Sequence, residues 1–102
     1  MTERTGGALA SARGLFDVEI QALEAVRDSL DGRFLDILEQ IVNCRGKVII
    51  TGMGKPGHIG TKIAATMASL GTPAFYLHPA EALHGDLGMV GAEDVVLAIS
   101  YS

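Results

Sequence analysis

The spacing of hydrophobic positions changes near residue 47, and the two patterns predict two kinds of structure in the 102-residue chain. Residues 1–10 show no regular pattern, so we predict a flexible N-terminus. Residues 11–46 show apolar positions at helical spacing, broken once, which predicts a pair of N-terminal helices. Their apolar faces consist of Leu15, Val18, Ala22, Val26 and Leu30 in the first and of Phe34, Leu38, Ile41 and Val42 in the second.

Apolar runs of strand length alternate with helical patterns in residues 47–102. The first run, 47–51, is continuous and rich in β-branched residues, which is typical of a strand buried on both faces. The other predicted elements are a helix at 56–70, a strand at 74–77, a helical or looped segment at 80–90 and a strand at 94–100. This order predicts an α/β fold with a three-layer parallel sheet flanked by helices. No helical pattern follows the third strand, so we expect the first half of a larger domain, truncated after about three strands.

Charge and composition exclude several classes of function. The net charge is -4 and no basic run occurs, which argues against nucleic-acid binding. Two tyrosines, three phenylalanines and no tryptophan are too few for a base-stacking platform. No apolar run reaches the length of about 18 residues that a transmembrane helix needs, and the N-terminus does not read as a signal peptide. The single cysteine, Cys44, fits a reducing compartment, so we expect a cytoplasmic protein that does not bind membranes.

A glycine-rich turn joins the first predicted strand to the helix at 56–70. Glycine stands at positions 52, 54, 57 and 60, and Lys55 lies inside the turn. Glycines let backbone N–H groups approach a ligand, and a helix N-terminus carries partial positive charge. We therefore predict a site for a phosphorylated or acidic small molecule that includes Gly52, Gly54 and Lys55. The alternative interpretation is that the glycines only permit a tight turn.

The spacing from Gly52 to Gly57 also matches the G-x-G-x-x-G fingerprint of dinucleotide-binding domains. That fingerprint needs an acidic residue at the end of the second strand, where it binds a ribose hydroxyl. Here the second strand ends at Leu77, His78 and Pro79. The dinucleotide interpretation is therefore disfavoured.

Polar residues follow the second and third strands at the same edge of the predicted sheet. The first group matches no recognised pattern of metal ligands, so we predict that it lines a pocket and that no metal binds. Its members are His78, Glu81, His84 and Asp86. Ser100 and Ser102 follow the third strand, where hydroxyl groups commonly begin a phosphate-binding turn. Two serines alone are also compatible with an ordinary chain segment.

Several of these segments together resemble one continuous stretch of D-arabinose 5-phosphate isomerases, which belong to the sugar isomerase (SIS) domain superfamily. The segments are 52–60, 63–66, 71–75, 78–82, 84–89 and 94–100. The resemblance implies a flavodoxin-like fold, with a parallel sheet of five strands between helices. It also implies the interconversion of D-ribulose 5-phosphate and D-arabinose 5-phosphate, which feeds synthesis of the lipopolysaccharide sugar Kdo. Such enzymes use no organic cofactor and form homo-oligomers.

By motif position, the resemblance assigns Lys55 and His84 as catalytic residues and Ser100 and Ser102 as the start of a phosphate-binding loop. Pro56 and Tyr101 depart from the family pattern, which usually has serine and asparagine there. The chain also stops inside that loop, so we expect it to lack the later catalytic segments and to show little or no turnover alone. A non-catalytic module that binds a phosphosugar is therefore the alternative function.

Overall fold

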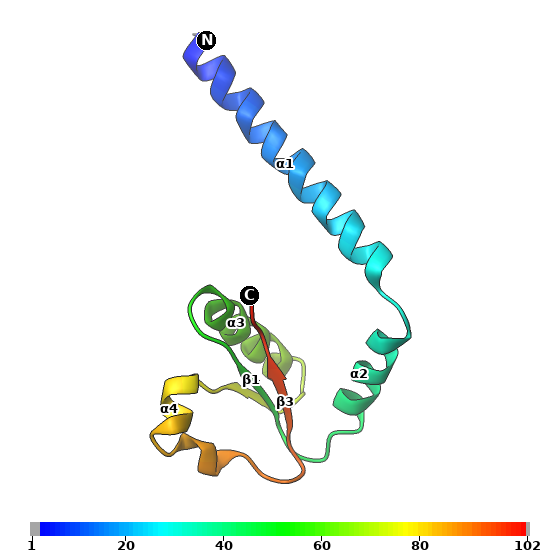
Figure 1. The fold of residues 1–102 in the computed structure, drawn as a ribbon, viewed down its shortest axis with the longest axis vertical. Helices are drawn as coiled ribbons and strands as arrows, with labels where there is room; N and C mark the ends of the chain where they lie inside the picture. The colour runs from blue at the N-terminus through cyan, green and yellow to red at the C-terminus, as the bar shows by residue number, and fades with distance from the viewer. Residues whose placement is uncertain (1–2, 102) are drawn as a thin grey trace. The chain divides into compact units, whose positions relative to one another are not determined.

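The computed structural model describes residues 3–101 of the chain (Figure 1). In chain order the elements are α1 (Glu3–Ser29), α2 (Gly32–Val42), β1 (Val48–Thr51), α3 (Lys55–Ser69), β2 (Ala74–Tyr76), α4 (Pro79–Leu83), the 3-10 helix η1 (Asp86–Met89) and β3 (Val95–Ala98). The described residues form two compact units, divided between Asp36 and Ile37. None of the described helices is long and apolar enough to cross a lipid bilayer.

The first unit is helical, and its first helix is longer than the sequence pattern predicts. We expected a helix from residue 11 and a flexible segment before it, but residues 3–10 extend α1 as regular helix. The glycines at positions 6 and 7 lie within this continuous helix, and a Cβ added to either would meet no atom within 4 Å. Asp31 caps the next helix, because its carboxylate accepts a 2.9 Å hydrogen bond from the Arg33 backbone N–H. The Arg33 guanidinium, and then this backbone bond, lower the pKa of Asp31.

The second unit contains a sheet of three parallel strands in the order β2-β1-β3. The central strand β1 is buried on both faces, since Val48, Ile49 and Ile50 are at most 1% exposed. This confirms the predicted strand at 47–51 and the predicted parallel α/β fold. All three predicted strands and the helix between the first two are present within one or two residues of their expected bounds.

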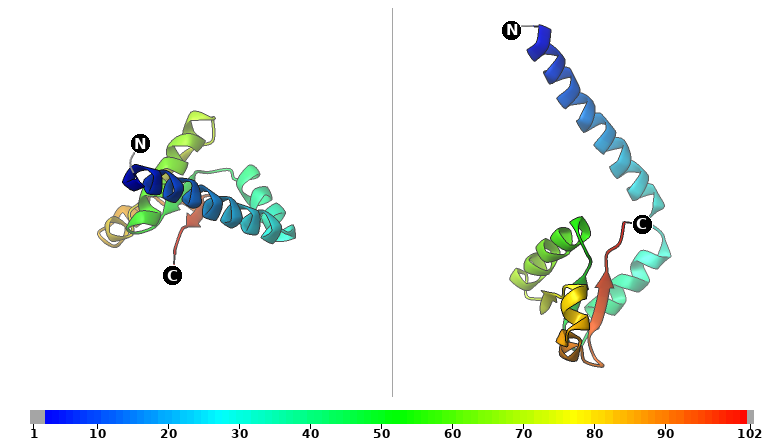
Figure 2. Two further views of the ribbon diagram at one scale, coloured as in Figure 1. Left: turned by 90° about the horizontal axis from the view of Figure 1, so that it is seen from above. Right: turned by 60° about the vertical axis from the view of Figure 1, so that its left-hand side comes forward.

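Helical segments cover the two faces of this sheet, which gives three layers (Figures 1 and 2). On one face α3 packs against β1 and β2, and the core there is formed by Val48, Ile50 and Ala64. Around that core pack Ile41, Cys44, Ile63, Met67, Ala74, Tyr76, Leu97 and Ile99. On the other face, α4 and η1 border an apolar cavity of about 370 Å³, lined by residues that include Ile49, Leu83, Leu87 and Val96. Val96 of the edge strand β3 is 52% exposed, as expected for a strand without a covering helix.

Asp94 connects the segments that precede β1 and β3. Its carboxylate accepts backbone hydrogen bonds of 2.7 Å from Lys47 and from Gly91, and its side chain is 3% exposed. These backbone bonds lower the pKa of Asp94, with the Lys47 ammonium adding to the effect. A Cβ at Gly46 would overlap a carboxylate oxygen of Asp94, so this approach requires glycine. A ligand site is therefore expected at the opposite, carboxyl ends of the strands.

Candidate functional site

The strand order places a ligand crevice between β1 and β3. From β1 the chain crosses to β2 on one side and then returns to β3 on the other. Ligands of open α/β sheets bind beyond the carboxyl ends of the strands at such a reversal. At this point Ile99 donates a 2.9 Å backbone hydrogen bond to Thr51, so the segments that leave β1 and β3 start side by side.

The glycines of the turn after β1 serve different purposes. Gly54 has a φ of 67°, a left-handed conformation that favours glycine. Gly52 is buried, and a Cβ there would lie 2.8 Å from the Ile99 carbonyl oxygen. Gly57 and Gly60 are buried on the side of α3 that faces the sheet. The tight packing of the turn therefore accounts for Gly52, Gly57 and Gly60 without a ligand, as the alternative interpretation of the sequence allowed.

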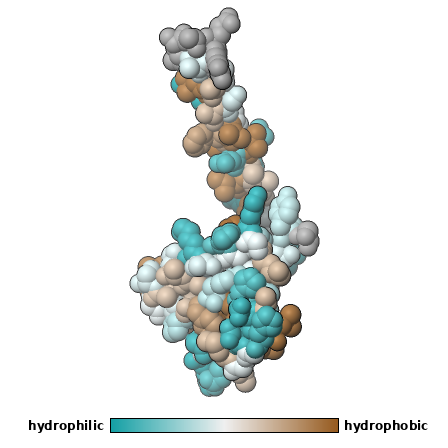
Figure 3. All heavy atoms as spheres, turned by 90° about the vertical axis from the view of Figure 1, so that its left-hand side faces the viewer, coloured by the Kyte–Doolittle hydropathy of each residue, from teal (hydrophilic) through white to brown (hydrophobic). Residues whose placement is uncertain are grey.

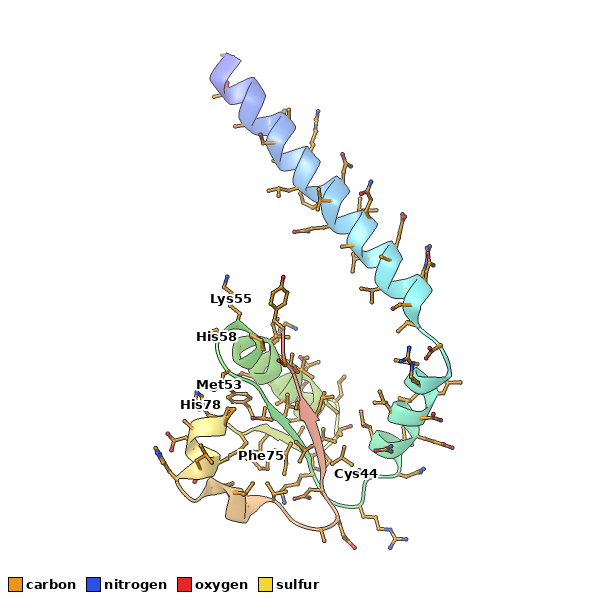
Figure 4. The ribbon with its side chains drawn as sticks, in the orientation of Figure 1. Cys44, Met53, Lys55, His58, Phe75 and His78 are labelled. Carbon is orange, nitrogen blue, oxygen red and sulfur yellow. The ribbon has the colours of Figure 1, made fainter. Side chains whose placement is uncertain are left out.

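A cavity of about 610 Å³ opens at the crevice and is lined by Lys55, Pro56, Ile59 and Tyr101. This volume suits a small molecule. Lys55 is the first residue of α3 and extends outward from the turn (Figure 4). Pro56 follows at a position where a helix needs no N–H donor. The positive end of the helix dipole and the Lys55 ammonium both favour an anionic ligand here.

The structure brings only some of the predicted site residues together. Gly52, Gly54 and Lys55 belong to one turn, and Ser100 follows β3, which pairs with the strand before that turn. Ser102 lies outside the described residues. His84 follows α4 as its C-cap and is exposed, and it is not among the residues that line the cavity of Lys55. The assignment of Lys55 and His84 as catalytic residues therefore stays a prediction.

The four polar residues that follow β2 do not converge on one point. They are His78, Glu81, His84 and Asp86. His78 caps α4, because its Nδ1 accepts a 3.0 Å hydrogen bond from the Ala80 backbone N–H. In residues 3–101, no three histidine, cysteine, aspartate or glutamate side chains are placed to hold a metal ion. Leu77, which is buried, follows β2 directly, so the ribose-binding acid of a dinucleotide site has no counterpart there.

Sequence reasoning missed Tyr76, the last residue of β2. Its hydroxyl donates a hydrogen bond to the Gly52 carbonyl oxygen, and its ring faces the imidazole of His78 edge-on at 6.4 Å. With Gly54, Gly57, His58, Thr61 and His78 it lines a second cavity of about 360 Å³ on the other side of the turn. The available signal was its position at a strand end, next to the turn of a neighbouring strand.

The chain thus contains an α/β domain with a glycine-rich turn and Lys55 at the carboxyl ends of its parallel strands. The family model of the SIS domain matches residues 40–102. Because this match covers more than half of the chain, the chain belongs to the SIS domain family.

Relatives of known name agree with this assignment. The chain is 53% identical over 94 residues to the arabinose 5-phosphate isomerase GutQ of Salmonella typhi, and these cover 92% of this chain and 29% of that protein. It is 48% identical over 95 residues to the arabinose 5-phosphate isomerase KpsF of Escherichia coli O6:H1, again with 92% and 29% coverage. The chain therefore spans less than a third of the length of these relatives.

A solved structure shares the fold as well. The protein c3406 of E. coli CFT073, determined in complex with arabinose 5-phosphate, superposes with a TM-score of 0.90 at 42% sequence identity. The superposition covers 100% of this chain and 53% of that chain.

Proposed function

We propose that this chain forms part of an aldose–ketose isomerase that interconverts D-ribulose 5-phosphate and D-arabinose 5-phosphate and supplies Kdo synthesis. The observation that carries the proposal is the cavity of about 610 Å³ at the reversal of strand order. Lys55, the first residue of α3, lines this cavity, so its charge and the N-terminus of the helix lie together there. Lys55 is the charged residue among those that line it. The names of the relatives support the choice of substrate, and Lys55 at the start of α3 supports a site for its phosphate or for a developing negative charge.

The reaction moves a proton between adjacent carbons through an enediolate. It therefore needs a base, a proton carrier between the oxygens, and positive charge close to the oxyanion. In our proposal Lys55 supplies that charge, while the turn at Gly52 and Gly54 and the hydroxyls of Ser100 and Ser102 hold the phosphate. His84 carries the proton, and its exposure at the end of α4 leaves it available to a site beyond its own chain.

The alternative is a SIS module that binds a phosphosugar without turning it over, and one experiment separates the two functions. Because the chain alone is expected to show little or no turnover, the complete protein of which we propose it forms part is incubated with D-arabinose 5-phosphate in heavy water. Deuterium at C2 is followed by NMR. An isomerase labels C2, because enediolate formation exchanges this proton with solvent. Binding without labelling would favour the non-catalytic module, and the absence of both would contradict the proposed ligand. NADH serves as the control for the dinucleotide interpretation.

We also propose that the chain forms a homo-oligomer through α1. Every large apolar side chain described on this helix is between 43% and 70% exposed, namely Leu9, Leu15, Phe16, Val18, Ile20, Leu23 and Val26. Figure 3 shows apolar residues along this helix. An exposed apolar face of this kind is typical of association surfaces. We expect a dimer or larger species in sedimentation velocity, whereas a monomer at high protein concentration would contradict the proposal.

A further inference from the structure

Tyr76 connects β2 to both ends of the turn that carries Lys55. At the start of the turn, its hydroxyl donates a hydrogen bond to the Gly52 carbonyl oxygen. At the end, a Cβ on Gly57 would lie 2.6 Å from the same hydroxyl oxygen and 2.6 Å from the Gly52 carbonyl oxygen. One phenol group therefore occupies the space that the backbone leaves free between the two glycines.

The ring of Tyr76 continues this contact along α3. A Cβ on Gly60 would lie 3.5 Å from one ring carbon of Tyr76 and 3.0 Å from Ile50 in β1. The ring belongs to the side chains packed around the core of Val48, Ile50 and Ala64. The packed ring thus fixes the position of the hydroxyl, and the hydrogen bond from this hydroxyl to Gly52 holds the turn against the core.

The middle of the turn has little other support. Met53 is 62% exposed, and Gly54 and Lys55 are exposed as well. Gly54 accepts the backbone hydrogen bonds of Gly57 and His58 at 3.0 and 3.3 Å, which start the helix but do not connect the turn to the sheet. The position of Lys55 depends on where Gly52 and Gly57 are held.

We propose that Tyr76 is a positioning residue for the anion-binding turn. Its hydroxyl holds the Gly52 carbonyl so that Lys55 and the start of α3 face the cavity shared with Tyr101. A preorganised site binds more tightly, because the turn does not have to be ordered when the ligand arrives. This inference rests on the proposed function for its ligand, D-arabinose 5-phosphate. The effect of Tyr76 on the order of the turn can be measured without any ligand.

The test replaces Tyr76→Phe, which removes only the hydroxyl and keeps the ring against α3. The matched control is Thr51→Val, because the Thr51 hydroxyl donates a 2.5 Å hydrogen bond to the Leu77 carbonyl oxygen at the same end of the sheet. The Thr51 side chain lines the apolar cavity on the opposite face, so this control removes a similar hydrogen bond that joins β1 to Leu77 and not to the turn. Both variants are measured at a temperature where they are fully folded.

Two quantities are compared among the unmodified chain, Tyr76→Phe and Thr51→Val. The Kd for D-arabinose 5-phosphate, from calorimetry, is expected to rise about tenfold in Tyr76→Phe and to stay unchanged in Thr51→Val. Hydrogen exchange at the Gly57 and His58 amides, without ligand, is expected to accelerate about tenfold in Tyr76→Phe alone.

The outcomes separate this inference from the proposed function. If the unmodified chain binds the sugar phosphate and Tyr76→Phe binds it equally well, Tyr76 is not a positioning residue. If the unmodified chain does not bind, the proposed function fails, and the exchange rates then decide about Tyr76. Equal rates in Tyr76→Phe and the unmodified chain would overturn the inference, while faster exchange in Tyr76→Phe alone would support it.

Discussion

Replacing Gly57→Ala should destabilise the second unit by about 2 kcal/mol. Alanine gains about 1 kcal/mol over glycine inside a helix, which by itself would stabilise α3. The added Cβ would lie 2.6 Å from the Gly52 carbonyl oxygen and 2.6 Å from the Tyr76 hydroxyl. The first of these is backbone and the second is held by a hydrogen bond, so neither moves away freely. Overpacking of this kind costs about 3 kcal/mol at its upper range, and the cost exceeds the gain.

Thermal unfolding followed by circular dichroism measures this difference, and Gly88→Ala is the control. No neighbouring atom lies within 4 Å of a Cβ at Gly88, and its φ is not positive. We expect Gly88→Ala to melt like the unmodified chain and Gly57→Ala to melt well below it. Equal melting of the two variants would mean that the turn and β2 are not in contact as described.

Replacing Lys55→Met should weaken binding of D-arabinose 5-phosphate about thirtyfold. Methionine keeps the apolar stem of the side chain and removes the charge. Hydrogen bonds to charged groups contribute about 2 kcal/mol, which corresponds to this change in Kd. Because Lys55 is exposed, its removal should leave the free energy of unfolding nearly unchanged. Isothermal calorimetry on the folded variant gives the Kd directly.

Lys62→Met is the matched control for this prediction. Lys62 lies on the same helix and is also exposed, but it does not line the cavity of Lys55. Its replacement changes the net charge of the chain by the same amount. If both variants weakened binding equally, the effect of Lys55 would be one of overall charge, and its assigned place in the site would be wrong.

The fold could be predicted because the local signals agree with one another. Val48, Ile49 and Ile50 are continuous and β-branched, and they form the buried central strand. The start of α1 was predicted less well, because the sequence from Thr5 to Ala10 holds two glycines and one large apolar residue, Leu9, which is too little for a helical period. Side chains that pack against nothing leave no periodic signal.

The site was predictable only where a single segment builds it. Lys55 and the glycines are close in sequence, so their turn could be recognised from spacing alone. The role of Tyr76 depends on the pairing of β2 with β1, which sets Ile50 beside Tyr76. The hydrogen bond from Tyr76 to Gly52 joins residues 24 positions apart, and neither residue reveals it by type. The catalytic roles of Lys55 and His84 stay predictions, because they rest on motif position alone.

The central claim is that the cavity between the ends of β1 and β3 binds a sugar phosphate. The most direct measurement is an NMR titration of the isotopically labelled chain with D-arabinose 5-phosphate. Our account predicts amide shifts in the turn from Gly52 to His58 and at Tyr101, with none around Cys44 and Asp94 at the opposite end of the sheet (Figure 4). Shifts confined to that opposite end, or no saturable shifts at all, would contradict it.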